Sequence, residues 1–360
     1  MKLLYHGRMW KGSTALQKFE AFRRQPGVTA ITHDAGTLSA PFNLLASVRW
    51  KLRWPSDQDR ENDRLIEAVA TEKPDVVFVD NSSCIARATL RKLREICDPL
   101  LVYHSPDDIT AWHNLTWPVR LTFPEWDLFF TTKTFNVPEL RAFGVRDPVL
   151  LGNAFDPELH RPMSREEVGE EYERFDLVFI GTFEEDRFRY IRMLAEAGHT
   201  VAVYGNPARR FSRGWEMTRH ERITVGPPAL GVDYSRVMHH GKIALCFLRK
   251  MNRDRITTRS IEIPAMRRAM VAEKTDEHDC HFADGSEYFG FRDETELLDR
   301  VRALLADDGL RLKIAESGRA RCFASGYTTA DRGLEMTAAI NRAAAARLDR
   351  RKTTAILAER

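Results

Sequence analysis

The sequence has little of what marks secreted, membrane-spanning or metal-rich proteins. Only five of its 360 residues are cysteines, and they are scattered without a C-x-x-C pair, so neither a disulfide framework nor a structural zinc site is expected. The longest uninterrupted apolar stretch, Ile243 to Leu248, is far shorter than the ~20 residues of a membrane-spanning helix. No charged-then-apolar leader opens the chain, and we therefore expect a cytoplasmic protein.

An excess of one charge is also lacking. The 55 basic and 52 acidic residues give a net charge of +3, which is too small to indicate a nucleic-acid partner. The excess lies in the tail from Ala338 to Arg360, which holds six basic and two acidic residues. With 43% hydrophobic and 30% charged residues, the composition is that of a globular protein, and the length favours two domains.

Short apolar runs of strand length alternate with amphipathic stretches of helix length. Near-continuous runs of Val, Ile, Leu and Phe are typical of parallel strands covered on both faces. Strand alternating with helix predicts right-handed βαβ units, and therefore an α/β fold of doubly wound parallel sheets. The predicted strands are Leu3–His6, Asp75–Asp80, Leu100–His104, Leu128–Thr131, Val149–Gly152, Leu177–Gly181, Val201–Gly205, Ile223–Gly226, Ile243–Leu248 and Met270–Glu273. The predicted helices include Arg64–Ala70, Ile85–Ile96, Phe188–Ala197 and Glu296–Leu305.

A proline-containing segment and a charged stretch separate the two series of strands. Asn153 to Pro162 contains two prolines, and Ser164 to Glu173 is highly charged, which is typical of an interdomain connection. We therefore predict Rossmann-like domains at 1–153 and 174–327, followed by a C-terminal segment at 328–360. Ligands of such sheets bind at the carboxyl ends of the strands, so the cleft between the domains is the expected binding site.

Three strand ends carry residues that could contact a ligand. Gly12 and Ser13 precede a predicted helix, where backbone N–H groups could bind phosphate, or where Ser13 could simply cap the helix. In the second domain, Gly181–Thr182 and Gly205–Asn206 follow predicted strands. Glycine permits close approach of a ligand to the backbone, although either pair could be ordinary turn chemistry.

Glu262 is a carboxylate within an apolar helical stretch, between Ile261 and Ile263. Burial of a carboxylate is unfavourable unless a partner binds it. Ribose hydroxyls would satisfy this carboxylate, and so would backbone N–H groups at the start of the helix near Thr257 and Thr258.

A family resemblance follows from several segments in order. Thr258-Arg-Ser-Ile-Glu-Ile-Pro-Ala265, with Glu273–Glu277, Phe282–Glu287 and Glu294–Leu298, resembles the C-terminal half of group-1 glycosyltransferases, and within them the spore-maturation-protein-like branch. The N-terminal half and the linker of that family resemble Lys73–Asp80, Pro106–Asp108, Asp127–Lys133 and Leu151–Pro157. The resemblance extends to about Arg332, and the order and spacing of the segments make it specific.

This resemblance implies a GT-B fold whose second domain holds a nucleotide diphosphate sugar of the UDP or GDP type. Asp254 and Glu262 correspond to the family's Glu-x7-Glu pattern, which implies that Asp254 lies near the donor sugar and Glu262 near the ribose. Gly181, Thr182 and the helix start at Thr258 would face the diphosphate. Arg187 and Arg259 are candidate diphosphate cations, which would replace a metal, and no other cofactor is expected.

In the first domain, the resemblance implies that His104 lies near the reacting sugar. Asp107 and Asp108 follow within one turn, and a carboxylate–histidine pair could orient the acceptor or relay a proton. An aspartate at the start of a helix is equally often a cap, and both interpretations stay open.

Three other segments receive structural interpretations. His278-Asp-Cys-His281 is expected to be a solvated loop. Phe42 to Trp54 is basic and amphipathic; it could meet a membrane or a bulky acceptor, but we expect it to pack on the first domain. We expect Thr328 to Leu348 to be helical and to pack on the first domain, and the residues from Asp349 onward to be a dispensable basic extension.

The sequence therefore predicts a cytoplasmic glycosyltransferase that moves a hexose-type sugar to an unknown glycan, protein or small-molecule acceptor. Retention of the anomeric configuration follows from the resemblance. The alternatives are a nucleotide-sugar epimerase on the same fold, and a catalytically silent protein that binds a nucleotide sugar or serves assembly.

Overall fold

The chain forms two compact units in a computed structural model that describes residues 1–36, 44–57, 59–205, 216 and 218–358. Unit 1 comprises Met1–Gly152 together with Thr329–Arg360, and unit 2 comprises Asn153–Thr328. The segment 154–173, which the sequence indicated as a connection, therefore folds with unit 2. The C-terminal segment folds with unit 1.

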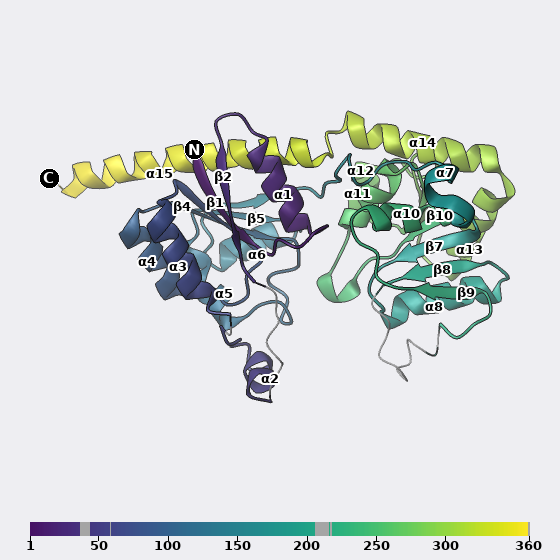
Figure 1. The fold of residues 1–360 in the computed structure, drawn as a ribbon, viewed down its shortest axis with the longest axis horizontal. Helices are drawn as coiled ribbons and strands as arrows, with labels where there is room; N and C mark the ends of the chain where they lie inside the picture. Colours follow the sequence, from purple (N-terminus) through teal and green to yellow (C-terminus); the bar gives the residue numbers. More distant parts are fainter. Residues whose placement is uncertain (37–43, 58, 206–215, 217, 359–360) are drawn as a thin grey trace. The chain divides into compact units, whose positions relative to one another are not determined.

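Unit 1 is built on six parallel strands in the order β2-β1-β3-β4-β5-β6 (Figure 1). The strands are β1 (Lys2–Gly7), β2 (Thr29–Asp34), β3 (Val76–Asp80), β4 (Leu100–Ser105), β5 (Leu128–Thr131) and β6 (Pro148–Leu150). All were predicted from sequence except β2, an edge strand whose half-exposed residues form no continuous apolar run.

Two apolar layers cover the faces of this sheet. Leu4, Val77 and Val79 face one helical layer, whereas their neighbours Tyr5 and Phe78 face the other. This alternation explains why the strands are apolar at every position. The helices are α1 (Thr14–Arg23), α2 (Leu44–Lys51), α3 (Glu61–Glu72), α4 (Arg87–Ile96), α5 (Trp117–Thr122), α6 (Asn136–Ala142) and α15 (Thr329–Ala358).

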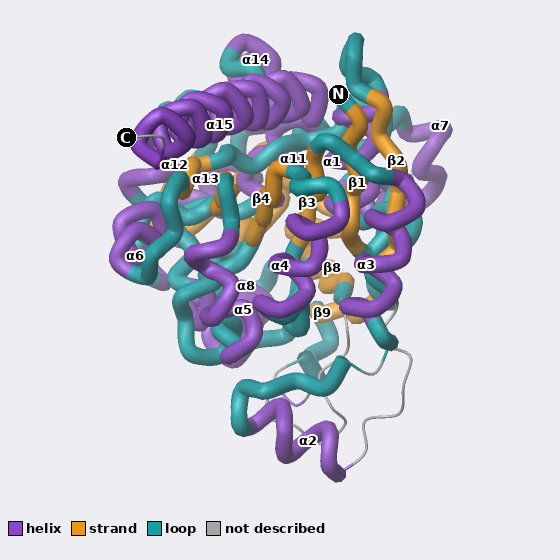
Figure 2. The backbone as a smooth tube through the Cα atoms, turned by 90° about the vertical axis from the view of Figure 1, so that its left-hand side faces the viewer, coloured by secondary structure: helices purple, strands orange, loops and turns teal. Residues whose placement is uncertain are grey.

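The long C-terminal helix α15 lies along unit 1 beside α1 (Figures 1 and 2). Its Met336, Ala339, Ile340 and Ala343 are buried in the same core as Phe22 of α1. Beyond this core, Arg347 forms an ion pair with the carboxylate of Asp98. The helix continues past Asp349, where Lys352 and Thr353 are exposed.

The segment from Phe42 to Trp54, which contains α2, was expected to pack on the first domain, but its large apolar side chains from Val48 onward are exposed. Val48, Trp50, Leu52 and Trp54 are all exposed, and α2 stands out from the body of unit 1 in both views (Figures 1 and 2). Residues 42 and 43 of the predicted segment lie outside the described residues.

Unit 2 is also a six-stranded parallel sheet, in the order β12-β11-β10-β7-β8-β9. Its strands are β7 (Phe175–Ile180), β8 (Val201–Tyr204), β9 (Ile223–Gly226), β10 (Gly241–Cys246), β11 (Ala269–Glu273) and β12 (Phe289–Phe291). The sequence predicted all of these except the three-residue β12. The helices are α7 (Arg165–Val168), α8 (Glu185–Glu196), α10 (Val232–Met238), α11 (Thr258–Ala265), α12 (Asp276–His281), α13 (Glu294–Ala306) and α14 (Asp308–Ala324).

The predicted α/β class of doubly wound parallel sheets is confirmed, and each strand order defines a switch point. In unit 1, the connection after β1 leads toward one edge of the sheet and the connection after β3 leads toward the other edge. In unit 2, the connections after β7 and β10 diverge in the same way. Ligands of open α/β sheets bind outside the carboxyl ends of the strands at such points. Among the described residues, no helix is both long and apolar enough to cross a membrane.

Candidate functional site

Arg187 of α8 joins the two strand ends at the switch point of unit 2. Its Nη1 donates to the carbonyl of Thr182 after β7 at 3.2 Å, and its Nε donates to the carbonyl of Leu248 after β10 at 3.3 Å. The side chain is 2% exposed, and a carboxylate oxygen of Glu184 lies 3.9 Å from its Nε. Its Nη2 is buried without a hydrogen-bond partner among the described residues. A buried guanidinium with an unused donor is poised to bind an anion.

Arg259, the second residue of α11, adds a further positive charge. Its Nε is likewise buried without a hydrogen-bond partner in the described part of the chain. Burial, and then the charge of Arg259, lower the pKa of Arg187, while Glu184 and Asp254 act in the opposite direction. The positive charges of the two guanidinium groups therefore oppose each other. A bound anion would relieve this repulsion.

The glycines at the ends of β7 and β8 have a packing role. A Cβ on Gly205 would lie 2.1 Å from the carbonyl oxygen of Gly181, and a Cβ on Gly181 would lie 2.9 Å from the ring of Phe179. The strand ends are thus too close for any side chain at position 205. Thr182 is exposed and uses its carbonyl to hold Arg187. Asn206 lies outside the described residues.

The start of α11 is held by a chain of buried polar groups. Thr257 caps the helix together with Ser260, and the Oγ of Ser260 lies 2.7 Å from Nε2 of His278. His278 is fully buried within α12, so the expectation of a solvated loop at 278–281 is wrong. Thr258 donates its hydroxyl to Oδ1 of Asn153 at 3.3 Å. These bonds fix the position of Arg259 in the first turn.

Glu262 is 8% exposed and finds partners that the sequence did not indicate. The hydroxyl of Tyr234 donates to Oε2 at 2.8 Å, and Nε2 of His160 lies 3.5 Å from Oε1. Because Nδ1 of His160 accepts from the backbone N–H of Asp156, Nε2 carries the proton that faces Glu262. Burial and Glu262 both raise the pKa of Tyr234, which keeps its hydroxyl a donor.

These partners change the reasoning about Glu262. The carboxylate does not require a ligand to be tolerated, because Tyr234 and His160 already stabilise it. A carboxylate has about four acceptor positions, so capacity for ribose hydroxyls remains. Asp254, which is separated from Glu262 by seven residues, is half-buried and accepts from Nδ2 of Asn252 at 2.8 Å.

In unit 1, His104 of β4 pairs with Asp80 of β3, its in-register neighbour. Nδ1 of His104 lies 2.7 Å from Oδ1 of Asp80, and the other carboxylate oxygen accepts from Tyr5 at 2.6 Å and pairs with Lys18 at 3.1 Å. Burial would raise the pKa of Asp80, but Lys18 and His104 outweigh it and lower the pKa. Burial and Lys18 lower the pKa of His104. The pair is therefore an aspartate and a neutral imidazole.

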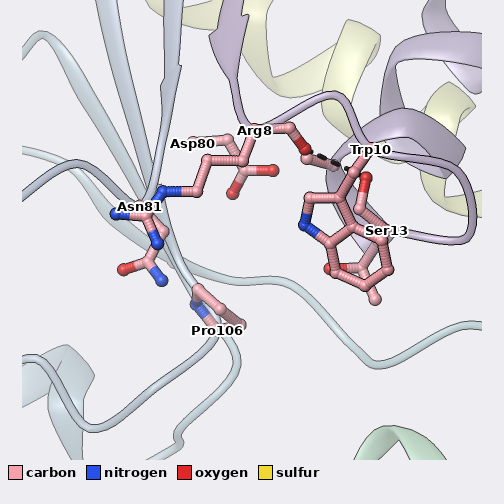
Figure 3. A pocket seen from close by; sticks show the side chains of 8 residues that line it. Arg8, Trp10, Ser13, Asp80, Asn81 and Pro106 are labelled. Atoms are coloured by element: carbon pink, nitrogen blue, oxygen red, sulfur yellow. Dashed lines mark hydrogen bonds between the residues drawn. The ribbon is translucent and has the colours of Figure 1, made fainter. Parts of the chain in front are cut away.

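The open pocket beside this pair lies at the β1/β3 switch point (Figure 3). Ser13 lines it, but its hydroxyl donates to the carbonyl of Arg8 and accepts from the N–H of Leu16, so Ser13 is the N-cap of α1. Gly12, just before it, has a φ of 88°, a conformation that favours glycine. The pocket is lined by Arg8, Trp10, Ser13, Thr14, Ala15, Asp80, Asn81 and Pro106.

Asp108 holds a turn together and does not cap a helix, because the next helix after β4 is α5, which begins at Trp117. It is fully buried, and its Oδ1 accepts from the N–H groups of Thr110 and Ala111 and from Nδ2 of Asn136. Asp107 is half-buried in the same turn. The sequence offered Asp107 and Asp108 as carboxylate partners of His104, whereas the carboxylate that bonds its Nδ1 is Asp80. Aligning the ends of the two predicted strands would have found Asp80.

A second polar cluster in unit 1 contains metal-capable atoms. One ligand atom each of Asp57, Glu61 and Cys84 lies within 4.8 Å of the others. These atoms already bond one another and the backbone. Sγ of Cys84 donates to Oε2 of Glu61 at 2.8 Å, and the carboxylate of Asp57 accepts from the backbone N–H groups of Glu61 and Asn62. Burial and Glu61 raise the pKa of the Cys84 thiol, so it keeps its proton.

The comparisons agree with this architecture. A family model described as glycosyl transferase-like matches residues 187–338, which include Arg187, Arg259 and Glu262. No protein of curated function matches the chain.

Solved structures match over nearly the whole chain. Sucrose-phosphate synthase from Thermosynechococcus elongatus has a TM-score of 0.68 at 12% identity, covering 96% of this chain and 99% of that one. Anabaena HepE, solved in complex with UDP and glucose, has a TM-score of 0.67 at 14% identity, covering 95% and 100%. A glycosyltransferase from Rickettsia africae has a TM-score of 0.65 at 12% identity, covering 95% and 98%. The chain therefore has the two-sheet fold of GT-B glycosyltransferases, and its residues 187–338 match the glycosyl transferase-like family model.

Proposed function

We propose that the protein is a glycosyltransferase that takes a hexose-type sugar from a nucleoside diphosphate donor of the UDP or GDP type. The observation that carries the proposal is the pair Arg187 and Arg259, both with buried, unused N–H donors beside the switch point of unit 2. A diphosphate is the anion that suits two neighbouring guanidinium groups. Anabaena HepE, with the same fold, was solved with UDP and glucose.

The other residues receive roles around this diphosphate. Glu262, already aligned by Tyr234 and His160, would accept from the ribose hydroxyls. Asp254 would contact the donor sugar, a role that rests on the resemblance to the Glu-x7-Glu pattern of group-1 glycosyltransferases. The exposed end of β7 at Gly181–Thr182 and the start of α11 at Thr258 would approach the diphosphate with backbone groups.

The chemistry follows from the same charges. Two guanidinium groups and the start of α11 can stabilise the leaving diphosphate, so we propose a metal-independent reaction.

Retention of configuration and membership of the spore-maturation-protein-like branch rest on the sequence resemblance. His104, oriented by Asp80, would face the acceptor side. Five free thiols fit a reducing compartment, the cytoplasm.

The test is calorimetric titration of the full-length chain with UDP and with GDP, each with and without excess chelator. We expect one nucleotide to bind, with an affinity that the chelator leaves unchanged. Arg259→Gln should weaken binding at least about tenfold, since a charge-assisted hydrogen bond contributes ~1.5–3 kcal/mol. Arg236→Gln is the matched control, because that arginine of α10 has a side chain that is 42% exposed and paired with Asp233.

Each outcome separates the alternatives. No binding of either nucleotide would overturn the donor site. Binding that vanishes with chelator and returns with magnesium or manganese would overturn metal independence. Analysis of the products formed from the donor distinguishes sugar transfer from epimerisation. Nucleotide binding without donor turnover, whichever acceptor is added, would favour a catalytically silent nucleotide-sugar-binding protein.

A further inference from the structure

Unit 1 exposes a group of large apolar side chains on two adjoining segments, α2 with the residues after it and the region that leads into α5. We call this group the tryptophan surface; it consists of Val48, Trp50, Leu52, Trp54, Trp112, Trp117 and Leu121. The exposed fractions run from 41% for Trp50 to 72% for Trp112. Four of the seven tryptophans of the chain lie here. Patches of this kind on a protein surface mark interaction sites.

The two segments are joined by direct contacts. The backbone N–H of Trp117 donates to the carbonyl of Arg53 at 2.8 Å. The guanidinium carbon of Arg53 lies 4.8 Å from the centre of the Trp112 ring, in a cation–π arrangement. Leu121 follows Trp117 by one turn of α5. The two segments that carry the tryptophan surface therefore lie side by side.

The charge of the tryptophan surface has a single sign. Residues 44–56 and 109–121 contain four basic residues and no acidic residue, although the whole chain has nearly equal numbers of each. Arg49 and Lys51 are exposed beside Trp50. The flanking carboxylates point elsewhere: Asp57 accepts from the start of α3, and Asp108 is fully buried.

The shape and chemistry select the partner. Small-molecule and sugar sites are concave, whereas α2 stands out from the body of unit 1 (Figures 1 and 2). Aliphatic Val48 and Leu52 would gain from burial in acyl chains, tryptophan favours the interface between water and lipid, and the basic residues would attract anionic headgroups. We propose that the tryptophan surface binds the face of an anionic lipid bilayer. It lies wholly in unit 1 and uses no residue of the proposed donor site.

The test is co-sedimentation of the full-length chain with vesicles. Vesicles of equal parts phosphatidylglycerol and phosphatidylcholine should bind the protein at low salt, and high salt should release a large part of it. Vesicles of phosphatidylcholine alone should bind at least about tenfold less, because the basic residues then lose their partners. Tryptophan fluorescence should shift to shorter wavelength upon binding.

Three variants assign the binding to this surface. Leu52→Ser combined with Trp112→Ser removes the two most exposed apolar side chains and should weaken vesicle binding about tenfold or more. Arg49→Glu combined with Lys51→Glu should do the same and remove the preference for anionic lipid. Leu334→Ser on α15, a leucine of similar exposure to Leu52, is the matched control and should bind like the wild type.

Several results would overturn the proposal. These are no binding to anionic vesicles, binding that the Leu52 and Trp112 substitutions leave unchanged in a folded protein, and equal binding to both vesicle types. Sedimentation that reveals an oligomer lost in the Leu52 and Trp112 variant would assign the surface to a second copy of the chain instead. Thermal unfolding and nucleotide titration of each variant establish that the fold is intact.

Discussion

The two units contain similar six-stranded parallel sheets, but the buried charged side chains at the two switch points differ in whether partners within the protein neutralise them. In unit 1, the buried Asp80 is matched by Lys18, Tyr5 and His104, so its carboxylate is compensated within the protein. In unit 2, Arg187 and Arg259 hold unused donors among the described residues and repel each other. A compensated network serves to fix the position of its members, whereas uncompensated charge calls for a ligand. This difference supports our proposal that unit 2 binds the anionic donor.

The units also differ in how they complete their cores. Unit 2 is continuous in sequence, whereas unit 1 needs α15 from the far end of the chain. A chain cut after Tyr327 should lose roughly 5 kcal/mol or more of unit 1 stability, because Met336 and Ile340 alone contribute ~1.5–3 kcal/mol each by burial. Thermal unfolding and dye binding to exposed apolar surface would measure the loss, while nucleotide binding by unit 2 should persist.

The matched control for that truncation is a chain cut after Leu348. It keeps the four buried positions of α15 and the ion pair of Arg347 with Asp98. We expect it to unfold like the full chain. Equal stability of both truncated chains would contradict the role of α15.

The second prediction tests the compensated network. Asp80→Asn leaves Lys18 without its buried partner and should destabilise unit 1 by about 3–5 kcal/mol, as expected when one member of a buried pair is removed. Asp63→Asn, which breaks an exposed pair with Arg60, should change stability by less than about 1 kcal/mol. Chemical denaturation measures the free energy of unfolding of both variants. Similar losses of stability in the two variants would contradict a stabilising role of the buried pair of Asp80 and Lys18.

Acid should destabilise unit 2 through His278. Burial lowers its pKa to about 4, with backbone hydrogen bonding and the neighbouring His281 and Asp279 as smaller influences. The unfolded chain takes up this proton near pH 6.5, whereas the folded chain resists it, so stability is lost as the pH falls from about 6.5 to about 4. The loss from this one group is on the order of 2 kcal/mol at pH 5. His278→Gln should flatten the dependence of unfolding on pH over that range; an unchanged slope would contradict it.

The smallest effect is expected for Glu262, whose substitution tests the proposed ribose contact in the donor site. Glu262→Ala should weaken nucleoside diphosphate binding by about tenfold or somewhat more, since hydrogen bonds to a charged group contribute ~1.5–3 kcal/mol. Tyr234→Phe is the control, because it removes a partner of Glu262 but leaves the carboxylate in place. We expect less than about a threefold effect from it. Unchanged affinity of a folded Glu262→Ala variant in calorimetry would remove the ribose role.

Much of the fold could be predicted because parallel strands covered on both faces are apolar at every position, as in Val76–Asp80 and Ile243–Cys246. The two missed strands lack that signal: β2 is an exposed edge strand, and β12 has three residues. His278 was misjudged because its neighbours are polar, whereas its burial depends on Ser260 and on the chain around Glu273. The segment ending at Trp54 is amphipathic and was expected to pack through its apolar residues, yet an amphipathic pattern does not specify what covers the apolar side chains.

By itself, the sequence determined the α/β class, the two series of strands and the residue types at their carboxyl ends, because these depend on local patterns of apolar and turn-forming residues. Only the tertiary structure decided the order of the strands, and with it the two switch points. It also decided which partners meet there: Asp80 with His104, Tyr234 and His160 with Glu262, and Arg187 with Arg259. These pairs are separated in sequence by 24 residues or more, and no local pattern records contacts that form only when distant strands and helices pack together.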